Sequence, residues 1–232
     1  MSIEKIYAAI NSEPAVHKVM ANAPLKIIER MRVVEFEIGE FNLRQGESYD
    51  ETYLLVAGRV KVYLDSANGK SVVLDVYRPG MFLGEQEAVI NKPYSASIIN
   101  ITPVRLLKID NRDFVAWLND DQQFANRMIS YLSEQVYHLT KRTERYSLYS
   151  AMQQIGLELM RSAKEKRPIS REQLTYEVDT SYRNINRVLK RLSELGIIDA
   201  SKPAIKILNV EELQRIITVS YTHLRAHETE LH

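Results

Sequence analysis

Two arginines, Arg183 and Arg187, stand four residues apart at the start of an amphipathic segment. Residues four apart share one face of an α-helix, so both guanidinium groups would leave the helix on the same side. A guanidinium can donate two parallel hydrogen bonds to O6 and N7 of guanine in the major groove of DNA. The spacing therefore predicts base recognition by a helix. The expected DNA-contacting residues are Ser181, Tyr182, Arg183, Asn186 and Arg187 on this helix, with Ser170, Arg171 and Lys202 beside it.

The segment of residues 169–198 has the pattern of two short helices joined by a tight turn. Ser170 and Gln173 form a capping-box pair that starts the first helix, and Ser181 is a good N-cap for the second. Gly196 follows where the end of a helix favours a left-handed residue. The pattern predicts a helix-turn-helix, although an ordinary helical hairpin with a charged, solvated face has the same spacing. The side chains expected in its core are Leu174, Val178, Ile185, Val188, Leu189 and Leu192.

The residues after this segment favour DNA binding over an ordinary hairpin. Residues 199–208 predict a tight turn and a short strand, the wing of a winged helix, in which Lys202 and Lys206 would contact phosphates. Residues 161–206 hold 11 Lys and Arg against 6 Asp and Glu, a net charge of +5. Residues 1–111 hold 13 against 14, a net charge of −1. The positive charge is concentrated where contact with the DNA backbone is expected.

Length and composition bound the class of protein. A chain of 232 residues that is 45% hydrophobic can bury two modest cores. It has no apolar run of about 18 residues and no signal-peptide core, which predicts a cytoplasmic protein without membrane contact. The absence of cysteine excludes disulfides and thiolate-held iron–sulfur clusters. Residues 18–111 contain no histidine, so a paired catalytic base is missing there, and we expect neither enzymatic activity nor a cofactor.

Residues 31–110 alternate between apolar and polar side chains in short runs that turn residues separate. Asn68-Gly69 between two such runs is the strongest short signal for a β-hairpin. Six to eight strands at this spacing predict a small antiparallel barrel or β-roll. Residues 1–20 predict one amphipathic helix before it. The expected strands include residues 33–36, 53–56, 59–63, 71–76, 97–99 and 105–109.

A long helix is expected from about residue 120 to residue 149. Its apolar residues repeat at alternating spacings of three and four, which is typical of a parallel two-helix seam and predicts a homodimer. The alternative is a helix packed on its own barrel. A dimer would place two recognition helices on the half-sites of a palindromic operator. Ser150 and Gln153 form a second capping-box pair, which places a hinge at Tyr149–Ser150. The expected seam residues are Ile129, Leu132, Val136, Leu139, Thr143 and Tyr146.

The order of barrel, long helix and winged helix-turn-helix resembles the cAMP receptor/FNR (Crp/Fnr) family of bacterial transcription regulators. The resemblance covers about residues 25–215 and implies an α+β fold. It implies a sensor β-roll within 1–111, a connecting and dimerisation helix at 112–149 and a DNA-binding domain at 150–218. Residues 219–232 continue none of the periodic patterns, which predicts an adapter-derived tail. The resemblance is carried by Gly46-Glu47, Gly58-Arg59-Val60, Asn68-Gly69-Lys70, residues 79–85, Ser95-Ala96 and the whole segment 169–198.

In this family an effector, often cAMP, binds inside the barrel. By resemblance, Gly84 would start the helix that meets the cyclic phosphate, and Glu85 would bind the ribose. The arginine that pairs with the phosphate should precede Ser95-Ala96, and Tyr94 stands there instead. Losing that charge-assisted hydrogen bond costs roughly 1.5–3 kcal/mol, so we expect an effector other than cAMP, or none. The expected pocket residues are Gly84, Glu85, Tyr94, Ser95, Leu139 and Thr140, the last two matching adjacent hydroxyl residues of the family's cAMP receptors.

The family's best-known members read DNA with an Arg-Glu pair followed by another Arg. The matching positions here are Tyr182, Arg183 and Arg187, so only the last arginine carries over, and a different operator sequence is expected. The resemblance implies a regulator that binds double-stranded DNA as a homodimer and has RNA polymerase as a partner. The alternative is a cyclic-nucleotide-binding module that acts on a protein partner. Activation and repression are equally compatible with the residues.

Overall fold

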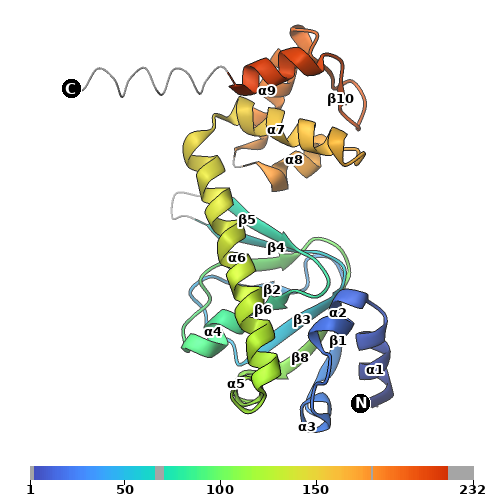
Figure 1. Cartoon of the computed structure of the whole chain (residues 1–232), viewed down its shortest axis with the longest axis vertical. Helices are drawn as coiled ribbons and strands as arrows, with labels where there is room; N and C mark the ends of the chain where they lie inside the picture. The colour runs from blue at the N-terminus through green and yellow to red at the C-terminus, as the bar shows by residue number, and fades with distance from the viewer. Residues whose placement is uncertain (1–2, 66–70, 179, 219–232) are drawn as a thin grey trace, which may run out of the picture. The chain divides into compact units, whose positions relative to one another are not determined.

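The computed structural model describes residues 3–65, 71–178 and 180–218, and the side chains of residues 145 and 146 lie outside this description. Asn68-Gly69, the Tyr146 side chain, Asp179 and the tail from residue 219 therefore lie outside the described residues. The chain divides into two compact units, Met1–Gln135 and Val136–His232. The first unit combines helices with β-sheet, and the second combines helices with a small β-hairpin. This composition confirms the α+β class (Figure 1).

The expected single N-terminal helix is wrong. The structure has α1 (Ile3–Asn11), α2 (Pro14–Val19) and α3 (Leu25–Ile28). Pro14 lacks a backbone N–H and stands at the start of α2, a position that proline favours, while it could not continue α1. The proline therefore converts one amphipathic segment into two short helices.

Among the residues that the structure describes, eight strands form the β-roll in two antiparallel four-stranded sheets, ordered β1-β8-β3-β6 and β2-β7-β4-β5. The predicted strand count is confirmed, and the two-residue strands β2 and β6 are the ones that alternation did not mark. Helix α4 (Glu85–Ile90) follows β6 directly. The strands are β1 (Arg32–Phe36), β2 (Asn42–Leu43), β3 (Glu51–Ala57), β4 (Val60–Asp65), β5 (Ser71–Tyr77), β6 (Phe82–Leu83), β7 (Ser97–Asn100) and β8 (Val104–Asp110).

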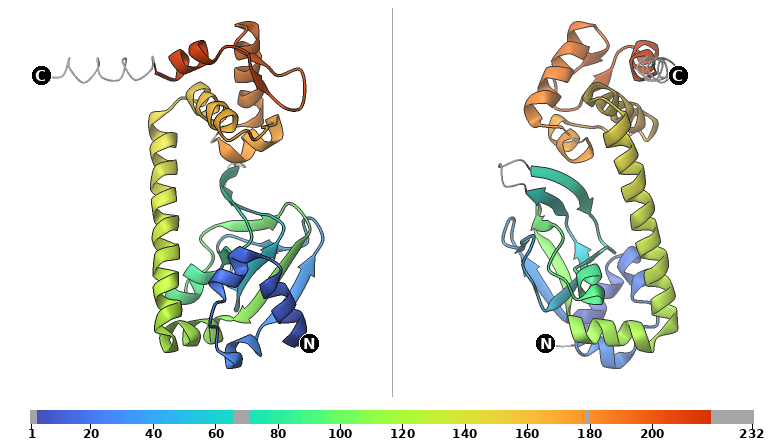
Figure 2. Two further views of the ribbon diagram at one scale, coloured as in Figure 1. Left: turned by 45° about the vertical axis from the view of Figure 1, so that its right-hand side comes forward. Right: turned by 90° about the vertical axis from the view of Figure 1, so that its left-hand side faces the viewer.

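Strand β3 is buried on both faces because its sheet lies between the second sheet and a layer of helices (Figure 2). Tyr53 and Leu55 belong to the core between the sheets, whereas Leu54 and Val56 belong to the core beneath the helices. Strands β4 and β5 pair with Asp65 opposite Ser71, as expected of the strands of a hairpin.

The predicted long helix is confirmed as α6 (Gln122–Leu148), which follows α5 (Asn111–Asp120). Asp121 separates the two helices and accepts hydrogen bonds of 3.0 Å from the backbone N–H groups of residues 123 and 124. The Phe124 ring stacks on Trp117 with centroids 3.5 Å apart. The Tyr131 hydroxyl, further along α6, accepts a hydrogen bond from the backbone N–H of Phe82. The first turns of α6 are thus part of the β-roll core.

The second unit contains α7 (Ala151–Lys164), α8 (Arg171–Glu177) and α9 (Tyr182–Glu194), followed by strands β9 (Ile198–Asp199) and β10 (Lys206–Ile207). Residues 210–218 form a closing helix. The capping boxes at Ser150 and Ser170 and the cap at Ser181 are confirmed. The six apolar residues expected in the core of the helix-turn-helix are all buried. Within the described ranges, no helix is long and apolar enough to cross a membrane.

Leu192 is fully buried in the core of this unit, and Leu192→Ala is expected to destabilise it. A buried leucine truncated to alanine costs about 2–5 kcal/mol, because the smaller side chain packs less apolar surface and leaves a cavity. Urea unfolding of the full chain measures the effect. Leu195→Ala, on an exposed residue of the same segment, is the control and should cost about 0.5 kcal/mol or less. Equal destabilisation in both variants would contradict this packing.

Candidate DNA-binding surface and effector cavity

The first two turns of α9 present a polar face. Ser181, Tyr182, Arg183 and Arg187 are exposed, and Asn186 is partly buried. The opposite face of α9 is buried in the core of the unit, so this face is the one available to a partner. The structure brings the five predicted α9 residues to one surface.

Arg187 is oriented by a neighbour that the sequence pattern did not mark. Its Nη2 donates a hydrogen bond of 2.6 Å to Oδ1 of Asn184. The Asn184 Nδ2 donates in turn to the Thr180 hydroxyl at 2.6 Å, and its backbone N–H donates to the Ser181 hydroxyl at 3.2 Å. Asn184 is therefore fixed from two sides, and it restricts the Arg187 side chain before any ligand binds.

The start of α8 lies against the wing formed by β9 and β10. Ser170 pairs with Ala204 in an isolated β-bridge, and the Arg171 guanidinium donates to the backbone carbonyl of Ala200 at 2.5 Å. Lys202, in the turn between the two strands, is exposed, as is Lys206. The three predicted residues outside α9 thus lie close together, but the Arg171 guanidinium already has a protein partner.

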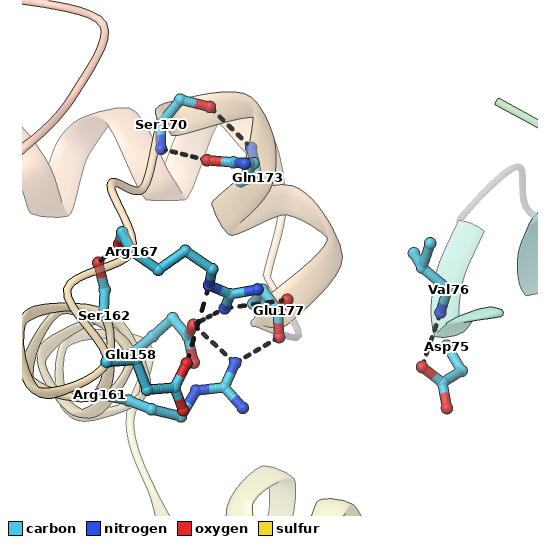
Figure 3. A network of polar contacts seen from close by, with 10 residues as sticks. Asp75, Val76, Glu158, Arg161, Ser162, Arg167, Ser170, Gln173 and Glu177 are labelled. Carbon is cyan, nitrogen blue, oxygen red and sulfur yellow. Dashed lines mark hydrogen bonds and ion pairs between the residues drawn. The ribbon is translucent and has the colours of Figure 1, made fainter. Parts of the chain in front are cut away.

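A cluster of four charged side chains ties α7 to α8 (Figure 3). The Arg161 Nη2 lies 2.7 Å from Oε1 of Glu158 and 2.8 Å from Oε2 of Glu177. The Arg167 Nη2 lies 3.6 Å from the same Glu158 oxygen and 3.9 Å from Glu177. Burial raises the pKa of Glu158, and the hydrogen bond from Arg161 opposes that rise. Because Glu177 ends α8, the cluster fixes the helix that leads into the turn.

A cavity in the β-roll brings together four of the residues expected in the effector pocket, Gly84, Glu85, Tyr94 and Ser95. Its volume is about 40 Å³, room for about three water molecules. Gly84 adopts a left-handed backbone, and a Cβ added there would overlap the Tyr94 hydroxyl. The Tyr94 ring therefore packs directly over the start of α4 and reduces the cavity.

Two carboxylates dominate the polar lining of this cavity. Burial raises the pKa of Glu85 to about 7, and the charge of Glu87 contributes to the rise. The Glu87 Oε1 accepts hydrogen bonds from the backbone N–H and the hydroxyl of Ser95, at 3.1 Å and 2.8 Å. Both Ser95 donors that face this region are thus bonded to a carboxylate of the protein itself.

Glu85 predicts a dependence of stability on pH. Its folded-state pKa lies above the ordinary 4.5, so between about 4.5 and 7 the folded chain binds more protons than the unfolded chain. The free energy of unfolding should fall as pH rises through this window, by on the order of 3 kcal/mol. Glu85→Gln should remove this contribution to the pH dependence of the free energy of unfolding. Denaturant unfolding at several pH values measures that dependence. Glu29→Gln, at an exposed carboxylate, should keep it, and an unchanged slope in Glu85→Gln would refute the assignment.

The remaining predicted residues lie on α6. Leu139 and Thr140, expected at the effector, are exposed, and the Thr140 hydroxyl donates to the backbone carbonyl of Val136 at 2.9 Å. Among the expected seam residues Ile129, Val136, Leu139 and Thr143 are exposed and Leu132 is half-buried.

Helix α6 ends at Leu148 and Ser150 caps α7, so the chain changes direction at the predicted hinge. Movement at this hinge stays a prediction.

Two family models match the chain one after the other. A model of the cyclic nucleotide-binding domain matches residues 33–121, and a model of the Crp-like helix-turn-helix domain matches residues 126–216. The chain belongs to the Crp/Fnr family of transcription regulators. The family is one of DNA-binding regulators rather than enzymes.

Three relatives of this Crp/Fnr regulator are distant from it in sequence. The CRP-like cAMP-activated global transcriptional regulator of Mycobacterium tuberculosis is 19% identical over 208 residues, which is 85% of this chain and 93% of that protein. A CooA mutant from Carboxydothermus hydrogenoformans has a TM-score of 0.67 at 16% identity, over 88% of this chain and 96% of that one. The c-di-GMP responsive regulator CLP from Xanthomonas campestris has a TM-score of 0.64 at 18% identity, over 79% and 99%. The two structures share its fold.

The cavity of this Crp/Fnr regulator does not fit a cyclic nucleotide. None of the described residues that line it is a lysine or an arginine, and Glu87, together with Glu85 when that group is ionised, would repel a phosphate. Its volume of about 40 Å³ is far below the roughly 300 Å³ of a typical small-molecule site. The side chains present therefore offer no partner for the phosphate of the family's usual effector.

Three functional features of this Crp/Fnr regulator were not predicted from the sequence. Asn184 is three residues before Arg187, a spacing that could have suggested their contact. The Arg161–Glu177 ion pair joins residues 16 positions apart on different helices, and no local pattern reveals it. Tyr77 also lines the cavity, although the alternation of its strand indicated only a strand.

Proposed function

We propose that the chain is a homodimeric, sequence-specific regulator that reads a palindromic operator through the first turns of α9. The observation that carries this proposal is Arg187, exposed on α9 and oriented by Asn184. A restricted guanidinium loses less side-chain freedom when it binds guanine than a mobile one does. Tyr182, Arg183 and Asn186 would complete the base-reading face, with Ser181, Ser170, Arg171 and Lys202 at the sugar–phosphate backbone.

The apolar side chains of α6 support the homodimer. Ile129, Val136 and Leu139 expose 61%, 63% and 55% of their surface in the single chain. They recur at heptad spacing, so a second copy of α6 packed in parallel would cover them. We propose that Leu132, Thr143 and Tyr146 complete this seam, and that the dimer presents its two α9 helices about one turn of DNA apart.

The cavity of the β-roll is the proposed sensor. Its effector is a molecule other than cAMP, or the regulator acts without one, because the lining offers no partner for a phosphate. Regulation would pass through RNA polymerase in the cytoplasm, where bacterial DNA is transcribed. The alternative is a module that acts on a protein partner. The positive net charge of residues 161–206 favours DNA as the partner instead.

The dependence of DNA affinity on salt tests the proposal. Each lysine or arginine bound to a phosphate releases counterions, so a dimer with six or more such contacts should bind about a thousand-fold more weakly at about 200 mM salt than at about 50 mM. Fluorescence anisotropy with labelled duplex DNA measures the slope. Lys202→Ala should reduce the slope by about one for each phosphate that the lysine no longer binds. Absence of DNA binding at low salt would favour the module with a protein partner.

A further inference from the structure

The cavity of the β-roll has the polarity of a site for a cation. Glu85 and Glu87 are its charged side chains, and no lysine or arginine is among the described residues that line it. The nearest candidates for binding an anion, the N–H and hydroxyl of Ser95, already donate to Glu87. An anion entering the cavity would therefore meet Glu87, and above about pH 7 also the ionised Glu85, with no cation among the described lining residues.

Two oxygen atoms at this cavity lack a hydrogen-bond partner among the described residues. They are Oε1 of Glu85 and the hydroxyl of Tyr94, whose residues expose only 3% and 4% of their surface. Buried polar atoms in folded proteins almost always have partners, and an exception calls for an explanation such as an ordered water or a bound ion. The ionised Glu85 carboxylate can only accept, so a ligand that hydrogen-bonds its Oε1 carries N–H or O–H groups.

The remaining lining suits an organic cation. Tyr77 and Tyr94 border the cavity, and the Tyr49 ring packs edge-on against Tyr94 with centroids 5.1 Å apart. Aromatic faces attract ammonium groups, and carboxylates beside them strengthen the attraction. A phenol hydroxyl and a carboxylate oxygen together offer an ammonium group two acceptors.

We propose that this cavity binds a small protonated amine, held by Glu85 and Tyr94. The inference rests on the proposed role of the cavity as the sensor and gives its ligand class. A volume of about 40 Å³ admits a ligand of about three water-sized groups, so an ammonium group bearing a short alkyl substituent fits. The amine enters already protonated, and no covalent step is involved.

Thermal unfolding of the full chain in methylammonium chloride, against sodium chloride at equal ionic strength, tests this inference. A ligand that binds only the folded state raises Tm, and methylammonium at several times its Kd should raise it by about 2–4 °C. Glu85→Gln, which keeps the shape of the side chain, should abolish the difference between the two salts. Tyr94→Phe, which removes only the hydroxyl, should reduce it.

Equal Tm values of the wild-type chain in both salts would overturn the inference. An equal gain in Glu85→Gln would also overturn it, because the amine would then act elsewhere. A rise in Tm with cAMP and none with methylammonium would return the cavity to the family's usual ligand. DNA binding is measured separately, so a chain that binds the amine and no DNA would refute the proposed function alone. A chain that binds DNA without any response to the amine would refute the amine site alone.

Discussion

Arg187→Ala is expected to reduce sharply the preference of the protein for its operator over random DNA. A bidentate contact between arginine and guanine contributes about 1–3 kcal/mol of discrimination. A homodimer makes the contact twice, so the ratio of specific to non-specific affinity should fall at least about 30-fold. Arg187 is exposed and lies outside the buried core of its unit, so the fold and the dimer should be unaffected.

Lys190→Ala is the matched control for this variant. Lys190 lies on the same helix, is exposed, and forms an ion pair with Glu194 at 3.7 Å. The substitution removes the same charge, so both affinities should weaken together while their ratio stays constant. Anisotropy titrations with operator and scrambled duplexes give the ratio. An unchanged ratio in Arg187→Ala would remove Arg187 from the base-reading face.

Val136→Glu is expected to dissociate the homodimer. Val136 lies at the centre of the proposed seam and is exposed in the single chain, so the substitution should leave each unit folded. In a parallel pair of α6 helices the two new carboxylates would face each other in an apolar seam, where a buried like-charge pair is strongly destabilising. Operator affinity should fall by about a hundred-fold or more, because each half-site would then bind alone.

Ser130→Glu is the control for the seam. Ser130 is exposed on α6 one residue after Ile129, so it lies off the repeat that the seam residues follow. The substitution introduces the same charge on the same helix as Val136→Glu, and the molecular mass in solution should remain that of a dimer. Sedimentation velocity distinguishes the variants. Dimers of both variants, or monomers of both, would contradict the proposed seam.

Much of the fold could be predicted from the sequence because its signals are local. Capping boxes join residues three apart, and the stripe of α9 repeats every three or four residues, so Ser170 and Leu192 could be placed from the chain alone. The break at Pro14 is also visible in the sequence, since proline cannot continue a helix, but the apolar periodicity of residues 1–20 runs through it. Strands β2 and β6 have two residues each, too few for alternation to be detected.

The interior of the site could not be predicted, because it depends on contacts between distant residues. Tyr94 marks a lost arginine in the sequence, but only the structure places its ring over Gly84 and so reduces the cavity. The unpartnered oxygen of Glu85 and the acceptance of both Ser95 donors by Glu87 are likewise three-dimensional facts of the described residues. The residue types in the sequence predicted the position of a ligand site. The class of ligand that fits it depends on the packing of side chains that are distant in the sequence.

Selection from a random double-stranded DNA library tests the central claim most directly. The full chain is incubated with the library alone and with a protein-free extract of bacterial cells, and the retained DNA is sequenced. We predict an enriched palindrome with half-sites about one helical turn apart, and a much weaker enrichment in Arg187→Ala. A library that remains random in both incubations would contradict sequence-specific DNA recognition by α9.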